Sequence, residues 1–318
     1  CSSDLMTDAN TQSWSPTLWR NVSIELPSAW EMLRFSRKLD IGRCAFADRY
    51  QVRLELSWRK VPCPPDRERM LSDYMTRLAD EGWERLQRVR EGSWDGIVGE
   101  QDGRPVSRFG HYFPALSCVL ELVFLWPDER ASALERRVLK SVKELPPENG
   151  QQVWRAFGLH MRLPAELVLE TCKQNAARAE FIFKATRAVD EFRFMRLGMV
   201  STWLTQSVTV WARHQAPRGI TMKHESVKTI DGHDVAYCAG RAKRWRRGLR
   251  LQRPHYESWA GLCPVDGRLY FVSSLARTCR GQISLPCACS SGTPLRSSST
   301  PDPEHKRPTP PLAEAESW

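Results

Sequence analysis

The chain has 318 residues, which is long for one hydrophobic core and comfortable for two domains of roughly 100–200 residues each. Thirteen Trp and eleven Phe offer ample aromatic surface to bury, so the composition excludes a largely disordered chain. The formal net charge of +10 permits an anionic partner without requiring one, and no run approaches the ~18 uncharged apolar residues that a membrane span needs.

The ten cysteines are scattered along the chain, which indicates buried free thiols in a reducing compartment and not a disulfide framework. The expected location is therefore the cytoplasm. An alternative is a lipid-anchored envelope protein, because Cys1-Ser2-Ser3-Asp4 has the form of the mature end of a bacterial lipoprotein. In the first interpretation Met6 is the true start, and the residues before it are upstream read-through or a fragment edge.

One segment of the chain recurs in altered form. Residues 19–27 read WRNVSIELP and residues 154–164 read WRAFGLHMRLP, and the same order of strand-like and helix-like patterns follows each copy. The repeat predicts two tandem modules. The expected boundaries are a polar leader at 1–17, a first module at 18–146, a linker at 147–152, a second module at 153–280 and a disordered Pro/Ser-rich tail at 284–318.

The first module is expected to begin with extended segments and to continue through a helix. Strands are predicted at 22–26, 30–35, 44–46 and 52–58, the last of which alternates apolar and polar residues throughout. Asp66 supplies a helix N-cap and Gly82 a helix end. Further strands are predicted at 94–98, 106–112 and 118–126, and a last helix follows Pro127-Asp128 with Ala131, Leu134, Val138, Val142 and Leu145 on one face.

The second module repeats this order without the closing helix. A helix is predicted from the spacing of Val200, Trp203, Leu204, Val208 and Trp211, and a late strand at 269–274. The predicted fold class is therefore α+β: two tandem modules, each a largely antiparallel sheet packed with one or two helices.

This order of elements resembles the α/β/α sandwich of the PsbP-like superfamily, which includes DcrB-type bacterial lipoproteins and a Ran-binding nuclear import factor. The resemblance rests on the openings Ile24-Glu25-Leu26-Pro27 and Met161-Arg162-Leu163-Pro164 and covers residues 19–145 and 154 to about 277. It implies a non-enzymatic binding or accessory role and carries over no functional residue.

Signatures of catalysis and of cofactor binding are absent from the sequence, so no catalytic or cofactor-binding residue is predicted. His224-Glu225 and His233-Asp234 place an imidazole beside a carboxylate, but neighbours in a strand point to opposite faces, and turn or surface positions are expected. The alternative is a hydrolase or transferase with a site in the cleft between the modules. Converging titratable groups there would favour an enzyme, whereas apolar groups and arginines would favour binding.

No metal site is predicted. Cys279, Cys287, Cys289 and His305 have the right chemistry for zinc, but they fall in the expected tail, and structural zinc sites pair their cysteines within ordered turns. Solvated tail cysteines are the simpler interpretation.

The strongest local signal is a basic arm at residues 241–253, with seven basic residues and no acidic one. The corresponding stretch of the first module, residues 99–107, is short and mixed in charge. The arm predicts contact with a polyanion such as nucleic acid, an anionic membrane surface or an acidic protein, and a solvated hairpin loop is the alternative. The leading hypothesis is therefore a non-catalytic binding or scaffold protein. Its candidate anion-binding residues are Arg241, Lys243, Arg244, Trp245, Arg246, Arg247, Arg250 and Arg253.

Overall fold

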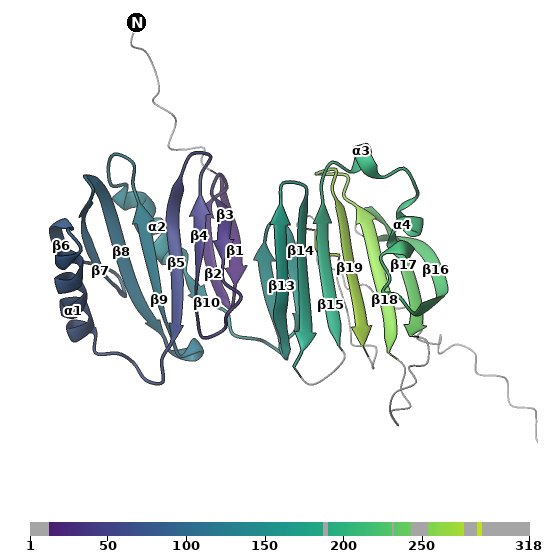
Figure 1. The fold of residues 1–318 in the computed structure, drawn as a ribbon, viewed down its shortest axis with the longest axis horizontal. Helices are drawn as coiled ribbons and strands as arrows, with labels where there is room; N and C mark the ends of the chain where they lie inside the picture. Colours follow the sequence, from purple (N-terminus) through teal and green to yellow (C-terminus); the bar gives the residue numbers. More distant parts are fainter. Residues whose placement is uncertain (1–12, 187–189, 231, 243–253, 277–284, 288–318) are drawn as a thin grey trace, which may run out of the picture.

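The computed structural model describes residues 13–186, 190–230, 232–242, 254–276 and 285–287. The fold is mostly antiparallel β structure arranged in three sheets (Figure 1). Of the described residues, 57% lie in strands and 15% in helices. The predicted α+β class is therefore wrong. The class differs for two reasons. The helices that form are short, and the sheets gain charged edge strands whose sequences show no apolar alternation.

The first half of the chain forms a seven-stranded N-terminal sheet with the order β3-β4-β5-β9-β8-β7-β6, in which all neighbours are antiparallel. Leu54, Leu56 and Trp58 alternate with less buried residues on one strand, as the sequence predicts. The strands are β3 (Glu31–Phe35), β4 (Ile41–Ala47), β5 (Val52–Lys60), β6 (Glu84–Glu91), β7 (Trp94–Gln101), β8 (Arg104–Phe113) and β9 (Cys118–Leu125).

The second half forms a C-terminal sheet with the order β13-β14-β15-β19-β18-β17-β16. The two sheets have the same strand order: β13 corresponds to β3, β14 to β4, and so on to β19, which corresponds to β9. The strands are β13 (Leu167–Asn175), β14 (Arg178–Ala185), β15 (Glu191–Leu197), β16 (Ile220–Ile230), β17 (His233–Ala242), β18 (His255–Leu262) and β19 (Leu269–Ala276).

A central sheet joins the two halves, with the order β10-β2-β1-β11-β12. It contains one hairpin from each copy of the repeated segment, and the hairpins meet where Leu18 pairs with Arg155. The first strand begins at Trp14, within the predicted leader. The strands are β1 (Trp14–Trp19), β2 (Val22–Pro27), β10 (Lys143–Glu144), β11 (Gln151–Ala156) and β12 (Leu159–Pro164).

The helices are α1 (Arg67–Asp80), α2 (Ser132–Ser141), α3 (Val200–Trp203) and α4 (Val208–His214), with a short 3₁₀ turn η1 (Pro114–Leu116). The α1 helix begins after Asp66 as predicted, and the Asp66 side chain accepts a hydrogen bond from the Arg69 amide at 3.1 Å. The α2 helix ends at Ser141, because the chain becomes extended at Val142 and continues as β10.

The helix predicted across residues 200–211 divides in two. Leu204 is extended, and the Ser207 hydroxyl caps α4 by accepting a hydrogen bond from the Val210 amide. A serine that bonds to the backbone in this way starts a new helix more readily than it continues one.

The main core is continuous across both halves. Trp19, Trp154 and Phe181 belong to one buried cluster that draws on all three sheets, and smaller clusters lie under α1 and α4. None of the helices in the described part of the chain is long and apolar enough to cross a membrane.

Candidate functional site

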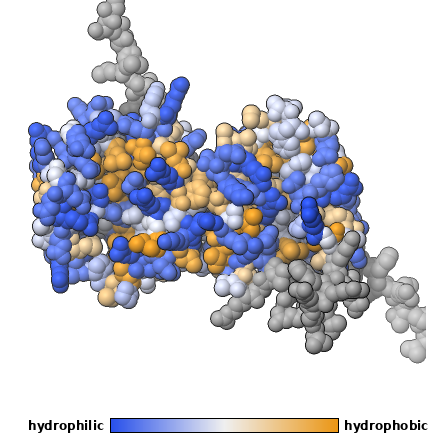
Figure 2. All heavy atoms as spheres, viewed as in Figure 1, coloured by the Kyte–Doolittle hydropathy of each residue, from blue (hydrophilic) through white to orange (hydrophobic). Residues whose placement is uncertain are grey.

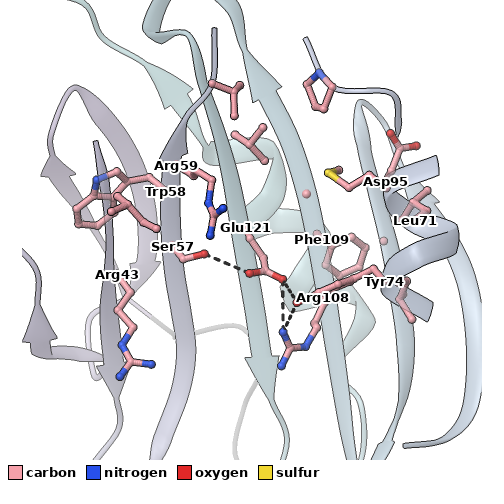
Figure 3. Close-up of a pocket in the computed structure, with 18 of the residues that line it drawn as sticks. Arg43, Ser57, Trp58, Arg59, Leu71, Tyr74, Asp95, Arg108, Phe109 and Glu121 are labelled. Atoms are coloured by element: carbon pink, nitrogen blue, oxygen red, sulfur yellow. Dashed lines mark hydrogen bonds and ion pairs between the residues drawn. The ribbon is translucent and has the colours of Figure 1, made fainter. Parts of the chain in front are cut away.

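A cavity of about 600 Å³ lies on the outer face of the N-terminal sheet, the face turned away from the main core (Figure 3). Alternation along the strands places polar groups there. On β5, Ser57 lies between the buried Leu56 and Trp58, and on β9 Glu121 lies between two buried leucines. The α1 helix packs on β6 and β7, so β4, β5 and β9 form an open side of the cavity.

The carboxylate of Glu121 is the polar centre of the cavity. The Ser57 hydroxyl donates to its Oε2 at 3.2 Å, and the Tyr74 hydroxyl donates to its Oε1 at 2.6 Å. The Arg108 guanidinium lies 3.4 Å from the same Oε1. Three donors from β5, α1 and β8 therefore converge on one carboxylate of β9, as Figure 3 shows.

Arg108 and Tyr74 also interact with each other. Arg108 donates to the Tyr74 hydroxyl, and its guanidinium lies over the Trp83 ring at 5.0 Å from the centroid. Burial, and then the charge of Glu121, raises the pKa of Tyr74 to about 12. Tyr74 is therefore a neutral hydrogen-bond donor at physiological pH, and the chain of bonds from Arg108 through Tyr74 to Glu121 fixes the centre of the site.

A glycine gives the cavity its depth. Gly110 on β8 pairs with Asp95 on β7 and with Glu121 on β9, so it lies between the two acidic residues of the site. A Cβ added at Gly110 would have no heavy atom nearer than the Leu120 carbonyl oxygen at 4.0 Å. The absence of a side chain at this position therefore leaves open space.

The arginines around the cavity differ in their partners. Arg108 is paired with Glu121, and Arg77 lies 3.6 Å from Glu81. Arg43 and Arg59 are exposed and form no ion pair with any carboxylate in the described part of the chain. Because Arg43 pairs across the sheet with Ser57, two residues before Arg59, these two guanidinium groups lie on one face beside Ser57.

The acidic residues of the cavity are compensated. Asp95 lies 3.7 Å from both Arg67 and Arg90, and Glu121 is neutralised by Arg108. The opposite wall is apolar and comes from α1 and the segment before it, through Met70, Leu71, Val61 and Pro65. Hydrophobic patches and hydrophilic side chains also intermingle over this half of the molecule in Figure 2. The cavity thus combines an apolar wall with two uncompensated cations.

A second, smaller cavity of about 130 Å³ lies where the two halves meet. Tryptophans 19, 58 and 154 line it together with Arg20, and neither a carboxylate nor a histidine is among its lining residues. Burial lowers the pKa of Arg20 to about 10, which leaves the guanidinium charged at neutral pH. Lys60, Asn21 and Gln152 also line this cavity, so it offers apolar groups, two cations and two amides.

Most of the predicted anion-binding residues lie outside the described part of the chain. Arg241 is exposed at the end of β17 and pairs with His255 of β18. The basic arm therefore connects these two strands, where the equivalent hairpin of β7 and β8 has only the turn Asp102-Gly103. The positions outside are Lys243, Arg244, Trp245, Arg246, Arg247, Arg250 and Arg253, and likewise Cys279, Cys289 and His305.

Two other sequence expectations differ from the structure. His233 is buried at 3% exposure, not at the surface, although its neighbour Asp234 is exposed as strand alternation predicts. Cys287, expected to be solvated in the tail, is 2% exposed, and its backbone forms an isolated antiparallel β-bridge with that of Leu159. The seven described cysteines form no disulfide.

The cavity on the N-terminal sheet was not predicted from the sequence. Its one visible signal is Glu121, a charged residue within the otherwise apolar run from Cys118 to Trp126. Its partners Ser57, Tyr74 and Arg108 are separated from it in sequence, and only the pairing of β5, β8 and β9 and the packing of α1 on the sheet bring them together.

No family model matches the chain, and no curated protein matches it. Among solved structures, the chain is similar to the apo structure of immunity protein TplEi of T6SS from Pseudomonas aeruginosa, with 8% identity and a TM-score of 0.32. The match covers 86% of this chain and 90% of that one. A likeness at this level carries no argument about function, and the PsbP-like resemblance stays a prediction.

Proposed function

We propose that this protein is a non-catalytic binding protein whose ligand, or a group of whose partner, enters the cavity on the N-terminal sheet. The chemistry of the cavity favours an amphipathic anion, with an apolar body against α1 and a carboxylate, sulfonate or phosphate beside Arg43 and Arg59. A volume of about 600 Å³ lies within the range of roughly 300–1,000 Å³ usual for ligand pockets.

The observation that carries this proposal is the unequal pairing of charges. Glu121 already accepts from three donors, whereas Arg43 and Arg59 have no described anionic partner. An incoming anion therefore meets two guanidinium groups without an ion-pair partner, while both carboxylates that line the cavity, Asp95 and Glu121, are already paired. Guanidinium groups bind carboxylates and phosphates through directed, charge-assisted hydrogen bonds.

The same geometry argues against catalysis in this cavity. The Ser57 hydroxyl donates to Glu121 and has no histidine beside it among the residues that line the cavity. The Glu121 carboxylate, held by three donors, is poorly placed to accept a further proton from a substrate. A serine and a carboxylate without a base between them lack the arrangement of a nucleophile and its base, and they suit a rigid polar surface of a binding site better.

A fluorescence titration with 1-anilinonaphthalene-8-sulfonate, an apolar ring system that carries one sulfonate, tests the proposal. The variant Arg43→Ala/Arg59→Ala should bind this probe at least about tenfold more weakly, since a hydrogen bond to a charged group contributes about 1.5–3 kcal/mol. Gly110→Leu should abolish binding by filling the cavity.

Two matched variants separate a specific effect from a general one. Arg34→Ala/Arg162→Ala removes two exposed charges outside the cavity, and Gly198→Leu adds a leucine at another glycine with room for a Cβ. Both should bind the probe as the unaltered protein does. Equal binding by all four variants would show that the probe sits elsewhere and would overturn the proposal.

A second contact with an anionic partner is proposed for the basic arm. The supporting observation is its place between β17 and β18, whose pairing continues to Arg241 and His255. A charged segment that replaces a two-residue turn at the end of a hairpin has little reason to be there for folding. A polyanion, an anionic membrane surface and an acidic protein are the partners that its charge suits.

The cytoplasmic location is also a proposal, supported by the absence of a disulfide among the seven cysteines in the described part of the chain. Anchoring through a lipid on Cys1 is the alternative. Mass spectrometry of the mature protein from native cells distinguishes them, because a start at Met6 supports the first and an acylated Cys1 supports the second.

A further inference from the structure

Three buried side chains with metal-binding chemistry meet beside the C-terminal sheet. His233, Cys263 and Cys287 are 3%, 1% and 2% exposed, and one ligand atom from each lies within 4.8 Å of the other two. They come from the start of β17, the residue after β18 and the segment 285–287, which are far apart in the sequence.

Backbone hydrogen bonds fix the place of each residue. The Cys263 amide donates to the Arg268 carbonyl at 2.9 Å, and the Gly267 amide donates back to the Cys263 carbonyl at 2.9 Å. His233 begins the strand that pairs with β16. The segment that carries Cys287 bonds to β12, where the His160 amide donates to the Pro286 carbonyl at 2.9 Å. The three side chains are thus brought together by the fold itself.

We propose that His233, Cys263 and Cys287 bind one Zn²⁺ ion. Zinc is bound tetrahedrally by thiolates at about 2.3 Å and imidazole nitrogen at about 2.0–2.1 Å, which places two sulfur ligands roughly 3.8 Å apart. Ligand atoms within 4.8 Å of one another reach that geometry through small side-chain rotations. Two sulfur ligands and one imidazole favour zinc over magnesium or calcium, which prefer oxygen ligands.

A carboxylate lies beside one of the three ligands. Asp266, in the turn between β18 and β19, lies within hydrogen-bonding reach of the Cys263 side chain. Its Oδ2 accepts a hydrogen bond from the Tyr270 hydroxyl at 2.7 Å, which orients the carboxylate. Asp266 is not among the residues whose ligand atoms all lie within 4.8 Å of one another, so the fourth position of the tetrahedron would be taken by a water molecule that donates to this carboxylate.

The ion would fasten the segment 285–287 to the C-terminal sheet. Leu285 and Cys287 are both buried, yet within the described part of the chain the backbone of this segment bonds to β12 alone. A zinc ion held by Cys287, Cys263 and His233 would add a link to β17 and β18. Metal binding to the folded chain would therefore stabilise this half of the protein.

Metal analysis of the full chain, purified under reducing conditions without chelator, tests the proposal. The unaltered protein should carry about one zinc per chain, and Cys263→Ala and Cys287→Ala should each lose most of it. The control is Cys238→Ala, which removes another buried cysteine of the same sheet that is not in the cluster and should leave the zinc content unchanged.

A second measurement needs no variant and so does not depend on the folding of one. Replacing zinc by Co²⁺ in the unaltered protein should give the intense visible absorption of a tetrahedral site with thiolate ligands, and chelator should lower the Tm. The proposal is overturned if zinc content is the same in Cys263→Ala and Cys287→Ala as in the unaltered chain. It is also overturned if the purified protein holds no zinc and its mass and peptide map show a Cys263–Cys287 disulfide.

Discussion

Leu18 of β1 and Arg155 of β11 occupy equivalent positions in the two hairpins of the central sheet and pair with each other. Trp14 pairs with Pro27 and Gln151 with Pro164, so Leu18 and Arg155 are each the fifth residue of their strand. Two equivalent residues paired in an antiparallel ladder lie on a local two-fold axis. The halves of the protein are therefore joined symmetrically, through a sheet to which each contributes a hairpin.

The junction predicts that the two halves unfold together. Trp154 is 3% exposed and its ring meets that of Trp19 at a centroid distance of 5.1 Å. Trp154→Ala should lower the free energy of unfolding by about 3–5 kcal/mol, the usual cost of removing a large aromatic side chain from a core. Urea unfolding followed by far-UV circular dichroism and by tryptophan fluorescence should give one coincident transition.

The matched control is Trp203→Ala, since Trp203 is 37% exposed and lies away from the junction. It should cost well under half as much stability. Two separate transitions in the unaltered protein, with only one moved by Trp154→Ala, would show that the halves fold independently.

Thiol reactivity should follow burial. Burial raises the pKa of both Cys44 and Cys172 to about 12 and that of Cys238 to about 11, whereas Cys63 is exposed. Because the thiolate is the nucleophile, a maleimide at pH 8 should label Cys63 quickly and the other three only after unfolding. Peptide mapping of the labelled native and urea-unfolded protein checks this, and rapid native labelling of Cys44 would be the contrary result.

The candidate site predicts a pH dependence at alkaline pH. The folded-state pKa of Tyr74 is about 12, above the value of 10 for an unperturbed tyrosine. Its contribution to stability is therefore fully present below pH 10 and is lost as the pH rises from 10 to 12. The difference in tyrosinate absorbance between the unaltered protein and Tyr74→Phe should titrate near pH 12. A midpoint near 10 would show that Tyr74 is not held by Glu121.

The basic arm predicts a salt-sensitive interaction. Arg244→Ala/Arg246→Ala/Arg247→Ala should elute from a heparin column at lower salt than the unaltered protein, because fewer counterions are displaced on binding. A triple variant that removes Arg34, Arg136 and Arg162, exposed arginines on other elements, is the control for net charge. Unchanged retention of the arm variant would rule out the arm as the anionic contact.

Local patterns in the sequence predicted the interior strands of the N-terminal sheet well. The alternation from Val52 to Trp58 falls within β5, and the cap at Asp66 marks the start of α1. The strand β6 (Glu84–Glu91) was not predicted, because it lies at the exposed edge of the sheet and its sequence is rich in charged residues. Edge strands carry such charges to prevent pairing with other molecules, so they show no hydrophobic period.

The two similar segments were visible in the sequence, and their Leu-Pro pairs indicate the register that the structure has. The match of Trp19-Arg20 with Trp154-Arg155 is two residues out of step with the structure, where Trp19 corresponds to Ala156. The Leu-Pro pairs at the ends of β2 and β12 do correspond. The two tryptophans are therefore not equivalent, whereas the Leu-Pro pairs that end the second strand of each hairpin are.

The candidate site could not be assembled from the sequence. Ser57, Tyr74, Arg108 and Glu121 come from four elements, and their meeting depends on the strand order β5-β9-β8 and on the packing of α1. The same holds for His233, Cys263 and Cys287, which share no metal-binding motif. Long-range pairing of this kind leaves no local pattern to detect.

A crystal structure of the full chain with decyl sulfate bound is the sharpest test of anion binding in the cavity of the N-terminal sheet. The sulfate should lie within hydrogen-bonding distance of Arg43 and Arg59, and the alkyl chain should lie along Met70 and Leu71. An empty cavity at saturating ligand, or decyl sulfate bound only at another surface, would contradict it.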